Sequence, residues 1–208
     1  MKILIADDHS VVRRGLRQIL LEGFPGSEIK EVGDAEDMVK QVINDTWDVV
    51  ISDLSMPGRT GLEALQQIKQ IEPKLPVLIL SIHPEEQYAL RALRAGASGY
   101  LSKDMAPDEL VNAVQRVMMG KKYITASIAE KLASSFDQDS DRPPHELLSD
   151  REFTVLKMLA KGKSVSEIAE AMFLSVTTVS TYRSRLLAKM NMKNNADLTL
   201  YAVENKLI

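Results

Sequence analysis

The stretch Lys2-Ile3-Leu4-Ile5-Ala6 is a short apolar run that ends in two carboxylates, Asp7 and Asp8. Three later runs end in the same way: 48–52 ends in Asp53, 77–80 ends in Ser81, and 99–102 ends in Lys103. Short runs rich in Val, Ile and Leu are typical of buried parallel strands. Because ligands bind beyond the carboxyl ends of such strands, we expect these polar side chains to share one crevice. Three carboxylates, a hydroxyl and an ammonium would suit Mg²⁺ and a phosphoryl group.

Helical patterns lie between these strands. Apolar residues recur at helical spacing after each run, and Pro73, Gly96 and Gly120 are expected to end three of the helices. A weaker strand is expected at 28–32. Five strand–helix units in about 120 residues predict an α/β domain with a doubly wound, five-stranded parallel sheet.

The second half of the chain carries only helical signals. A polar, acidic stretch at 134–144 ends in two prolines and is interpreted as a linker, preceded by a short helix at about 127–133. Four helices are then expected, and the sequence offers a capping residue for each: Ser149 with Glu152, Ser164 with Glu167, Ser175, and Asn194 or Asn195. We therefore expect one domain at 1–120, a linker with a short helix at 121–147, and an all-α domain at 148–208.

Charge is distributed unevenly between these two domains. Residues 1–147 hold 17 Lys and Arg against 23 Asp and Glu, whereas residues 148–208 hold 9 against 6. A basic second domain favours a phosphate-rich partner such as nucleic acid, although ordinary surface charge explains this balance about equally well.

The sequence also argues against several classes of protein. It contains no cysteine, which excludes disulfides and thiolate metal sites and fits a reducing, cytoplasmic environment. Its first residues turn acidic too early for a signal peptide, and no apolar run approaches the 18 residues of a membrane span. We therefore expect a cytoplasmic protein with no membrane partner.

The predicted crevice suits phosphoryl transfer to a carboxylate. An aspartate such as Asp53 can attack phosphorus and form an acyl phosphate, provided that a divalent cation offsets the repulsion between the oxygens. Asp7 and Asp8 could hold that cation, Lys103 could pair with phosphoryl oxygens, and Ser81 could hydrogen-bond one of them. Each residue alone would be an ordinary turn, cap or solvated side chain, so the prediction depends on all four strand ends together.

This combination resembles the receiver domain of bacterial response regulators. The matching residues are Asp7-Asp8, Asp53-Leu54-Ser55-Met56-Pro57-Gly58, Gly61, Ser81 and Lys103. The resemblance covers 1–120 and implies a flavodoxin-like fold in which Asp53 takes a phosphoryl group from a sensor histidine kinase. It also implies Mg²⁺ on Asp8, Asp53 and the Ser55 carbonyl, with Asp7 acting mainly through water.

Two positions in this domain need separate comment. Tyr100 matches the aromatic switch position of receivers, although a half-buried strand tyrosine is an equally good interpretation. Asp104 departs from the proline that often follows the lysine in receivers, so the geometry of this loop is left open. His83, two residues beyond Ser81, could touch the phosphoryl pocket.

The helices expected from Ser164 and Ser175 suggest a helix-turn-helix whose second helix is basic. On that helix Val179, Tyr182, Leu186 and Met190 form a stripe that is expected to face the core. The opposite side, which would face DNA, offers Thr177, Ser180, Thr181, Ser184 and Arg185. The basic residues Arg183 and Lys189 of the same helix are further candidate DNA contacts. A solvated basic helix in a small bundle is the alternative interpretation.

A second resemblance supports the DNA-binding interpretation. The segments 148–152, 166–169 and 178–182 resemble the LuxR-type, or NarL/FixJ-type, DNA-binding domain, and the match covers 148–208. Tyr182 departs from the histidine frequent in this family. The resemblance implies that the protein binds DNA as a homodimer, with Leu198, Tyr201 and Ala202 of the last helix as the subunit contact.

The sequence therefore favours a two-component response regulator, in which phosphorylation of Asp53 controls dimerisation and binding to promoter DNA. We expect it to catalyse only its own Mg²⁺-dependent phosphorylation and dephosphorylation. One alternative is a Mg²⁺-dependent phosphohydrolase with Ser55 in the place of the general acid. Another is a regulator whose first domain is never phosphorylated and serves only for interaction.

Overall fold

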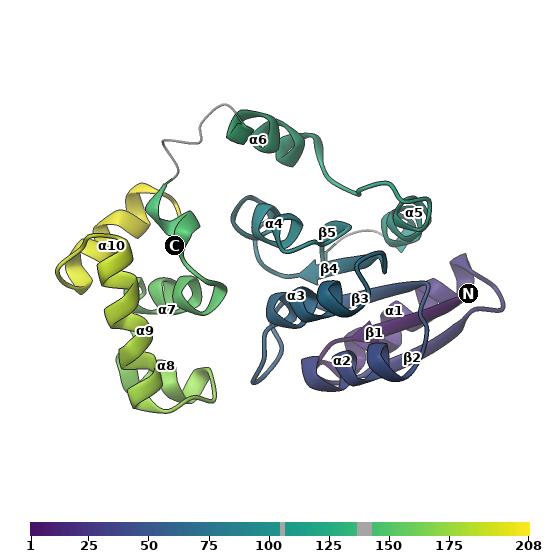
Figure 1. Cartoon of the computed structure of the whole chain (residues 1–208), viewed down its shortest axis with the longest axis horizontal. Helices are drawn as coiled ribbons and strands as arrows, with labels where there is room; N and C mark the ends of the chain where they lie inside the picture. Colours follow the sequence, from purple (N-terminus) through teal and green to yellow (C-terminus); the bar gives the residue numbers. More distant parts are fainter. Residues whose placement is uncertain (105–106, 137–142) are drawn as a thin grey trace. The chain divides into compact units, whose positions relative to one another are not determined.

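The computed structural model describes residues 1–104, 107–136 and 143–208. The chain divides into two compact units, Met1–Ser134 and Ser135–Ile208, each of which is described by itself (Figure 1). Within the described residues no helix is long and apolar enough to cross a membrane.

The first unit is built on a five-stranded parallel sheet, as the sequence predicted. Its strands are β1 (Lys2–Ala6), β2 (Glu28–Val32), β3 (Val49–Asp53), β4 (Val77–Ser81) and β5 (Gly99–Ser102). They lie in the order β2-β1-β3-β4-β5. The order reverses at β1, so β1 and β3 are neighbours, and the ends of β1, β3 and β5 face the same edge of the sheet.

Helices cover both faces of this sheet (Figure 1). The helices α1 (Ser10–Gly23) and α5 (Pro107–Met118) pack together on one face, over Ile3, Ile5, Val49, Ile51, Leu78 and Leu80. The alternate strand residues point to the other face, which α2 (Ala35–Asn44), α3 (Gly61–Ile71) and α4 (Glu85–Arg94) cover. Burial on both faces explains why the strands read as continuous apolar runs rather than alternating ones.

The helix that follows this domain is longer than the sequence indicated. It was expected at 127–133, but α6 spans Ala126–Phe136 and its Ile128 is buried. The next part of the expected linker, 137–142, lies outside the described residues.

The second unit is the expected all-α domain. After the short 3-10 helix η1 (Pro144–Leu147) come α7 (Asp150–Ala160), α8 (Val165–Ala171), α9 (Val176–Lys189) and α10 (Asn195–Glu204). The predicted N-caps are all present: Ser149, Ser164, Ser175 and Asn194 each accept a hydrogen bond from a backbone N–H in the first turn. The core contains Phe153, Leu156, Ile168, Val179, Leu186 and Leu198.

Candidate functional site

Lys103 joins two buried carboxylates at the carboxyl edge of the sheet. Its Nζ lies 2.7 Å from Asp7 Oδ2 and 2.8 Å from Asp53 Oδ2. Asp7 is 1% exposed and Asp53 is 4% exposed. Residues from the ends of β1, β3 and β5, far apart in the sequence, therefore meet at one point because the parallel strands end at one edge.

Burial and pairing act against each other on these charges. Burial raises the pKa of Asp53, and the hydrogen bond from Lys103 offsets only part of that rise. Burial alone would lower the pKa of Lys103, but its hydrogen bonds to Asp53 and Asp7 outweigh this and raise it. Two carboxylates against one ammonium leave an excess of negative charge that a further cation would offset.

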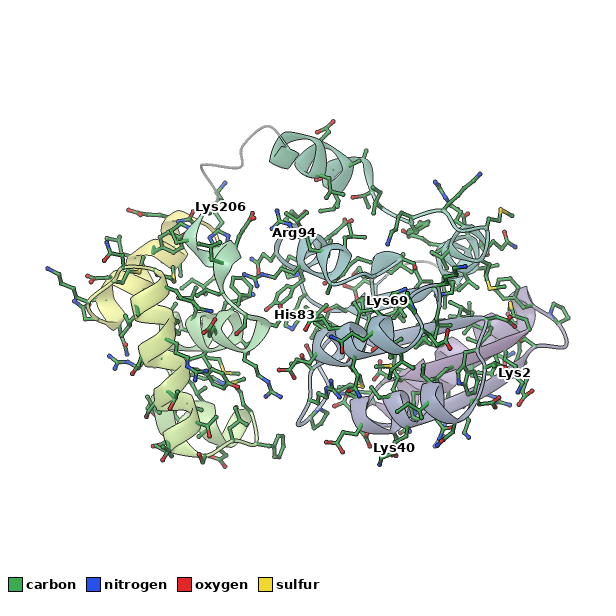
Figure 2. All side chains as sticks on the ribbon, viewed as in Figure 1. Lys2, Lys40, Lys69, His83, Arg94 and Lys206 are labelled. Atoms are coloured by element: carbon green, nitrogen blue, oxygen red, sulfur yellow. The ribbon has the colours of Figure 1, made fainter. Side chains whose placement is uncertain are left out.

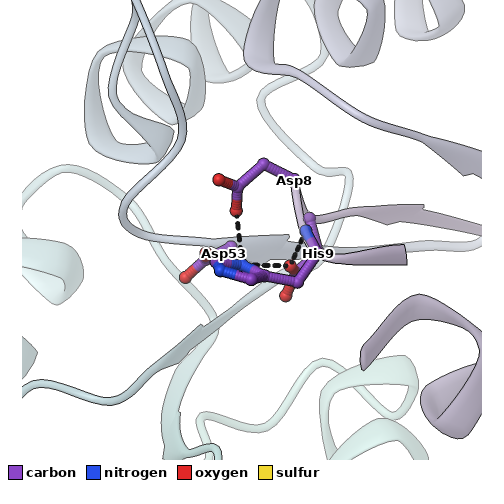
Figure 3. A group of neighbouring side chains, drawn as sticks. Asp8, His9 and Asp53 are labelled. Carbon is purple, nitrogen blue, oxygen red and sulfur yellow. Dashed lines mark hydrogen bonds and ion pairs between the residues drawn. The ribbon is translucent and has the colours of Figure 1, made fainter. Parts of the chain in front are cut away.

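Asp8 and His9 extend this cluster toward solvent. His9 Nδ1 lies 2.8 Å from Asp8 Oδ1 (Figure 3). The His9 backbone N–H donates to Asp7 Oδ1 at 2.8 Å. Asp7, Asp8, His9 and Asp53 can each offer one ligand atom, all within 4.8 Å of one another. Sequence reasoning missed His9, although its place directly after the two aspartates was a signal.

The two adjacent aspartates differ in what they can offer to a ligand. Both oxygens of Asp7 are in use, one by Lys103 and one by the backbone of His9. Asp7 Oδ2 and Asp8 Oδ1 are alike in that each lies close to an ionisable side chain, Lys103 and His9 respectively, without hydrogen-bond geometry. The two residues differ in exposure, because the Asp8 side chain is 25% exposed and that of Asp7 only 1%. Asp8 is therefore the more available oxygen ligand.

Gly61 allows the loop after β3 to close tightly on the acceptor strand. A Cβ at this position would lie 2.0 Å from the backbone oxygen of Asp53, so no larger residue fits without moving the backbone. Gly61 opens α3 behind a capping box made by Thr60 and Glu63. The glycine that the receiver motif contains at this position is therefore required for steric reasons.

Ser81 and Tyr100 belong to a hydrogen-bonded group centred on His83. The Ser81 hydroxyl accepts the His83 backbone N–H at 3.0 Å, and Tyr100 OH donates to the His83 carbonyl at 2.9 Å. The His83 ring stacks on Tyr88, and its Nε2 lies 3.0 Å from Ser55 Oγ. His83 therefore links the loop after β3 to the loop after β4.

Tyr100 is 2% exposed, and burial raises its pKa. Its ring therefore lies inward, next to β4, and its hydroxyl points to the loop after β4 that contains His83. Among the described residues no peptide bond is cis, so the Lys103–Asp104 bond left open by the sequence is trans.

The helix α9 presents polar side chains away from its own domain. Val179, Leu186 and Met190 are buried, Tyr182 is half-buried, and the opposite side is exposed at Thr177, Ser180, Thr181, Ser184 and Arg185. The hydroxyls of Thr181 and Ser184 donate to backbone carbonyls one turn earlier. Their hydroxyl hydrogens are thus used within the helix, and their oxygens can still accept hydrogen bonds.

Two of the basic residues predicted as DNA contacts form pairs within their own domain. Arg183 Nε donates to Asn195 Oδ1 at 2.8 Å, and Lys189 Nζ lies 2.7 Å from Oε2 of Glu152. Glu152 is 3% exposed and also caps α7, so Lys189 ties the end of α9 to the start of α7. In the part of the chain that the structure describes, Arg185 makes no such contact.

The expected dimer contact needs correction. Leu198 and Ala202 are 0% exposed because they pack into the core of their own domain, and Tyr201 OH lies 2.7 Å from His145 Nδ1. A second subunit cannot reach the two buried residues. The exposed apolar side chains of α10 are Leu200 and Val203, at 61% and 57%. The sequence therefore did not indicate which face of α10 is exposed.

Both halves of the chain match known protein families. Residues 3–115 match the response regulator receiver domain, and residues 146–202 match the luxR family of bacterial regulatory proteins. The chain belongs to the response regulators of two-component systems, with a receiver domain followed by a LuxR-type DNA-binding domain. It is a transcription regulator of that class.

Individual relatives cover the whole chain. Response regulator UvrY of Escherichia coli K12 is 39% identical over all of this chain and 95% of its own length. The oxygen regulatory protein NreC of Staphylococcus carnosus is 37% identical over all of this chain and 99% of its own.

Solved structures show the same architecture. RcsB of Salmonella enterica serovar Typhimurium, bound to the promoter rprA in the presence of the phosphomimetic BeF₃⁻, is 26% identical with a TM-score of 0.62. The match covers 97% of this chain and 98% of RcsB. A structure of two RcsB dimers on two parallel DNAs is 28% identical, with a TM-score of 0.59 and 98% of each chain covered.

Proposed function

We propose that Asp53 accepts a phosphoryl group from a sensor histidine kinase, and that this controls dimerisation and promoter binding by residues 148–208. The observation that carries the proposal is the contact of Lys103 with both Asp7 and Asp53 at the end of β3. A phosphoryl group on Asp53 adds negative charge and strong acceptor oxygens, and Lys103 and Ser81 are donors able to bind them.

The residues present fit Mg²⁺. It prefers oxygen ligands and binds through one or two carboxylates, which Asp8 and Asp53 can supply together with the carbonyl of Ser55. Asp7 is better suited to act through water, because both of its oxygens are already in use. The ion would neutralise the negative charge that otherwise repels a phosphoryl donor. Loss of the Asp8 carboxylate should weaken Mg²⁺ binding most.

The relatives support the coupling of the two domains. One solved RcsB structure combines a phosphomimetic with promoter DNA, and another holds RcsB dimers on DNA. For this chain we propose that α9 enters the major groove, with Thr177, Ser180, Thr181 and Ser184 facing base edges. Arg185 would contact phosphate. In place of Leu198 and Ala202, we propose Leu200 and Val203 as the subunit contact.

The alternative phosphohydrolase is less well supported. Such an enzyme needs a general acid near the nucleophile, and the residue two positions beyond Asp53 is Ser55. Its hydroxyl is engaged with His83, and a serine is a poor proton donor at neutral pH. Chemistry confined to the protein's own Asp53 fits these side chains better than turnover of external phosphoesters.

Phosphorylation with acetyl phosphate and Mg²⁺, followed by mass spectrometry of the intact protein and its peptides, tests the assignment. We expect one phosphoryl group, on the peptide that contains Asp53, and none in Asp53→Asn. Asp37→Asn is a matched control, because Asp37 is a surface aspartate on α2 that pairs with Lys40. Undiminished acyl phosphate in Asp53→Asn, or equal loss in both variants, would contradict the proposal.

The metal ligands are tested separately by calorimetric titration of Mg²⁺. Asp8→Asn should lose more affinity than Asp7→Asn. Equal losses in these two variants would remove the distinction drawn between the adjacent aspartates.

A further inference from the structure

A hollow of about 900 Å³ lies in the first unit, at the opposite edge of the sheet from Asp53. It is bounded by the segments that lead into β3, β4 and β5 and by the end of α5: 42–48, 69–76, 96–98 and 117–122. Its volume falls within the range of small-molecule sites, roughly 300–1,000 Å³, and it is open to solvent on one side. The phosphorylation chemistry makes no use of it.

Two lysines in the wall of this hollow are fixed in place by backbone carbonyls. Lys69 Nζ donates to the carbonyl of Leu75 at 2.5 Å and to that of Pro73 at 3.4 Å, and Lys122 Nζ donates to the carbonyl of Ala97. Gly96 has a φ of +105°, and a Cβ there would lie 2.9 Å from Lys69 Cγ. The glycine thus makes room for the stem of Lys69.

These two ammonium groups are poorly compensated. Within the described residues neither forms an ion pair with a carboxylate, and each ammonium has three N–H donors, of which Lys69 uses two and Lys122 one. Burial lowers the pKa of both lysines, and the charge of Lys122 lowers that of Lys69 further. An anion placed between them would relieve this repulsion and occupy the remaining donors.

The acidic residues around the hollow are partly engaged elsewhere. Asp45 forms an ion pair with Lys2 at 3.0 Å, and Asp48 accepts the Lys2 backbone N–H at 2.7 Å. Glu72 is exposed on the rim, as are the further lysines Lys74 and Lys121. Lys69 is half-buried and Lys122 is exposed, and backbone carbonyls hold the ammonium groups of both in place.

The remaining wall offers an aromatic and apolar surface. Trp47 is half-buried, and its Nε1 donates to the carbonyl of Gln41 at 3.1 Å, which fixes the ring. Val42, Leu75 and Val117 are buried side chains that also line the space. An anionic group and a flat apolar group could thus be bound together, at neighbouring parts of one cavity.

We propose that this hollow binds a small organic anion, with its phosphate or carboxylate group between Lys69 and Lys122 and a planar apolar part against Trp47. The site is separate from Asp53, so occupancy requires neither phosphorylation nor Mg²⁺. Lys69 is marked in Figure 2, as is Lys40 on α2, which lies outside the lining of the hollow.

The single tryptophan makes the proposal measurable in the full-length protein. Phenyl phosphate and benzoate are the probes, inorganic phosphate tests the anionic group alone, and benzyl alcohol tests the ring alone. Titration is followed by Trp47 fluorescence and by calorimetry, without Mg²⁺. We expect saturable binding of at least one ring-bearing anion, tighter than inorganic phosphate, and none of benzyl alcohol. Comparing the affinities of phenyl phosphate and benzoate shows whether the site prefers a phosphate or a carboxylate.

Variants separate the site from general surface charge. Lys69→Met and Lys122→Met keep the apolar stem and should each weaken binding at least tenfold, whereas Lys69→Arg should retain most of it. Lys40→Met is the matched control and should change affinity less than twofold, as should Asp53→Asn. Circular dichroism checks that each variant is folded.

The proposal is overturned if no probe binds with a Kd below about 10 mM. It is equally overturned if Lys40→Met weakens binding as much as Lys69→Met and Lys122→Met do. Loss of binding in Asp53→Asn would place the anion at the other edge of the sheet instead.

Discussion

The receiver and the DNA-binding domain hold their functional side chains in opposite ways. In the receiver, Asp7, Asp53 and Lys103 are withdrawn from water and satisfy one another at the ends of strands. On α9, Ser180 and Arg185 lie on the surface of one helix and are exposed to solvent. A site of the first kind is held in place by the sheet, whereas a site of the second kind becomes complete only on a partner.

A large loss of stability is expected from removing the cation that Asp7 and Asp53 share in the receiver. Lys103→Met leaves two buried carboxylates facing each other, which should lower the free energy of unfolding by about 3 kcal/mol at neutral pH. Asp53→Asn should cost less, because Asp7 and Lys103 still balance one another. Urea denaturation of the three proteins checks this order, and a smaller loss in Lys103→Met than in Asp53→Asn would contradict the ion-pair geometry.

The same lysine gives a pH dependence. Its folded pKa is raised above the ordinary value of 10.5, so its stabilising contribution is fully present below about pH 10.5 and is lost as pH rises through the folded pKa. The difference in unfolding free energy between wild type and Lys103→Met should therefore shrink in alkaline solution. A constant difference from pH 7 to pH 11 would argue that the Lys103 charge is not responsible.

In the DNA-binding domain, α10 offers a matched pair of leucines. Leu198→Ala removes a fully buried side chain and should destabilise the domain by about 2–5 kcal/mol. Leu200→Ala removes an exposed one and should change stability by less than about 0.5 kcal/mol. Thermal unfolding tests this, and analytical ultracentrifugation shows whether Leu200→Ala weakens dimers of the phosphorylated protein. If Leu198→Ala left the stability unchanged, Leu198 would not be a core residue, and the sequence-based prediction that it contacts a second subunit would stand.

These outcomes show where sequence reasoning holds and where it fails. The ends of parallel strands meet at one edge whatever surrounds them, so the convergence of Asp7, Asp53 and Lys103 followed from the order of the apolar runs. The exposed face of α10 depends on how it packs against α7, which no local pattern encodes. The pairing of Lys189 with Glu152 joins residues 37 positions apart and was invisible for the same reason.

The Lys189–Glu152 pair should have a moderate effect on stability. Lys189→Met leaves the carboxylate of Glu152 buried without its cation, but Lys189 is nearly half exposed, so we expect a loss of about 1 kcal/mol. The Glu152 carboxylate has a lowered pKa, so the pair stabilises above about pH 4.5 and its contribution fades as pH falls through the folded value. Acid unfolding of the isolated residues 143–208 measures both effects. An unchanged midpoint in Lys189→Met would show that the contact contributes nothing.

The smallest effect should distinguish the two basic residues on DNA. Arg185→Gln removes an exposed cation proposed to contact phosphate, which should reduce the slope of log K against log salt by about 0.9. Lys189→Gln should reduce it less, because that charge already faces Glu152. A salt series on one duplex with both variants checks the difference, and equal reductions would place Lys189 at the DNA after all.

The most direct test of the account is the affinity of the full-length protein for its promoter duplex before and after phosphorylation by acetyl phosphate, with Asp53→Asn treated identically and residues 143–208 alone as reference. We predict that phosphorylation tightens binding of the wild type at least tenfold and leaves Asp53→Asn unchanged. The duplex is obtained by selection from random sequences with the isolated domain. Equal tightening in both full-length proteins, or none in either while Asp53 carries the phosphoryl group, would contradict control of DNA binding through Asp53.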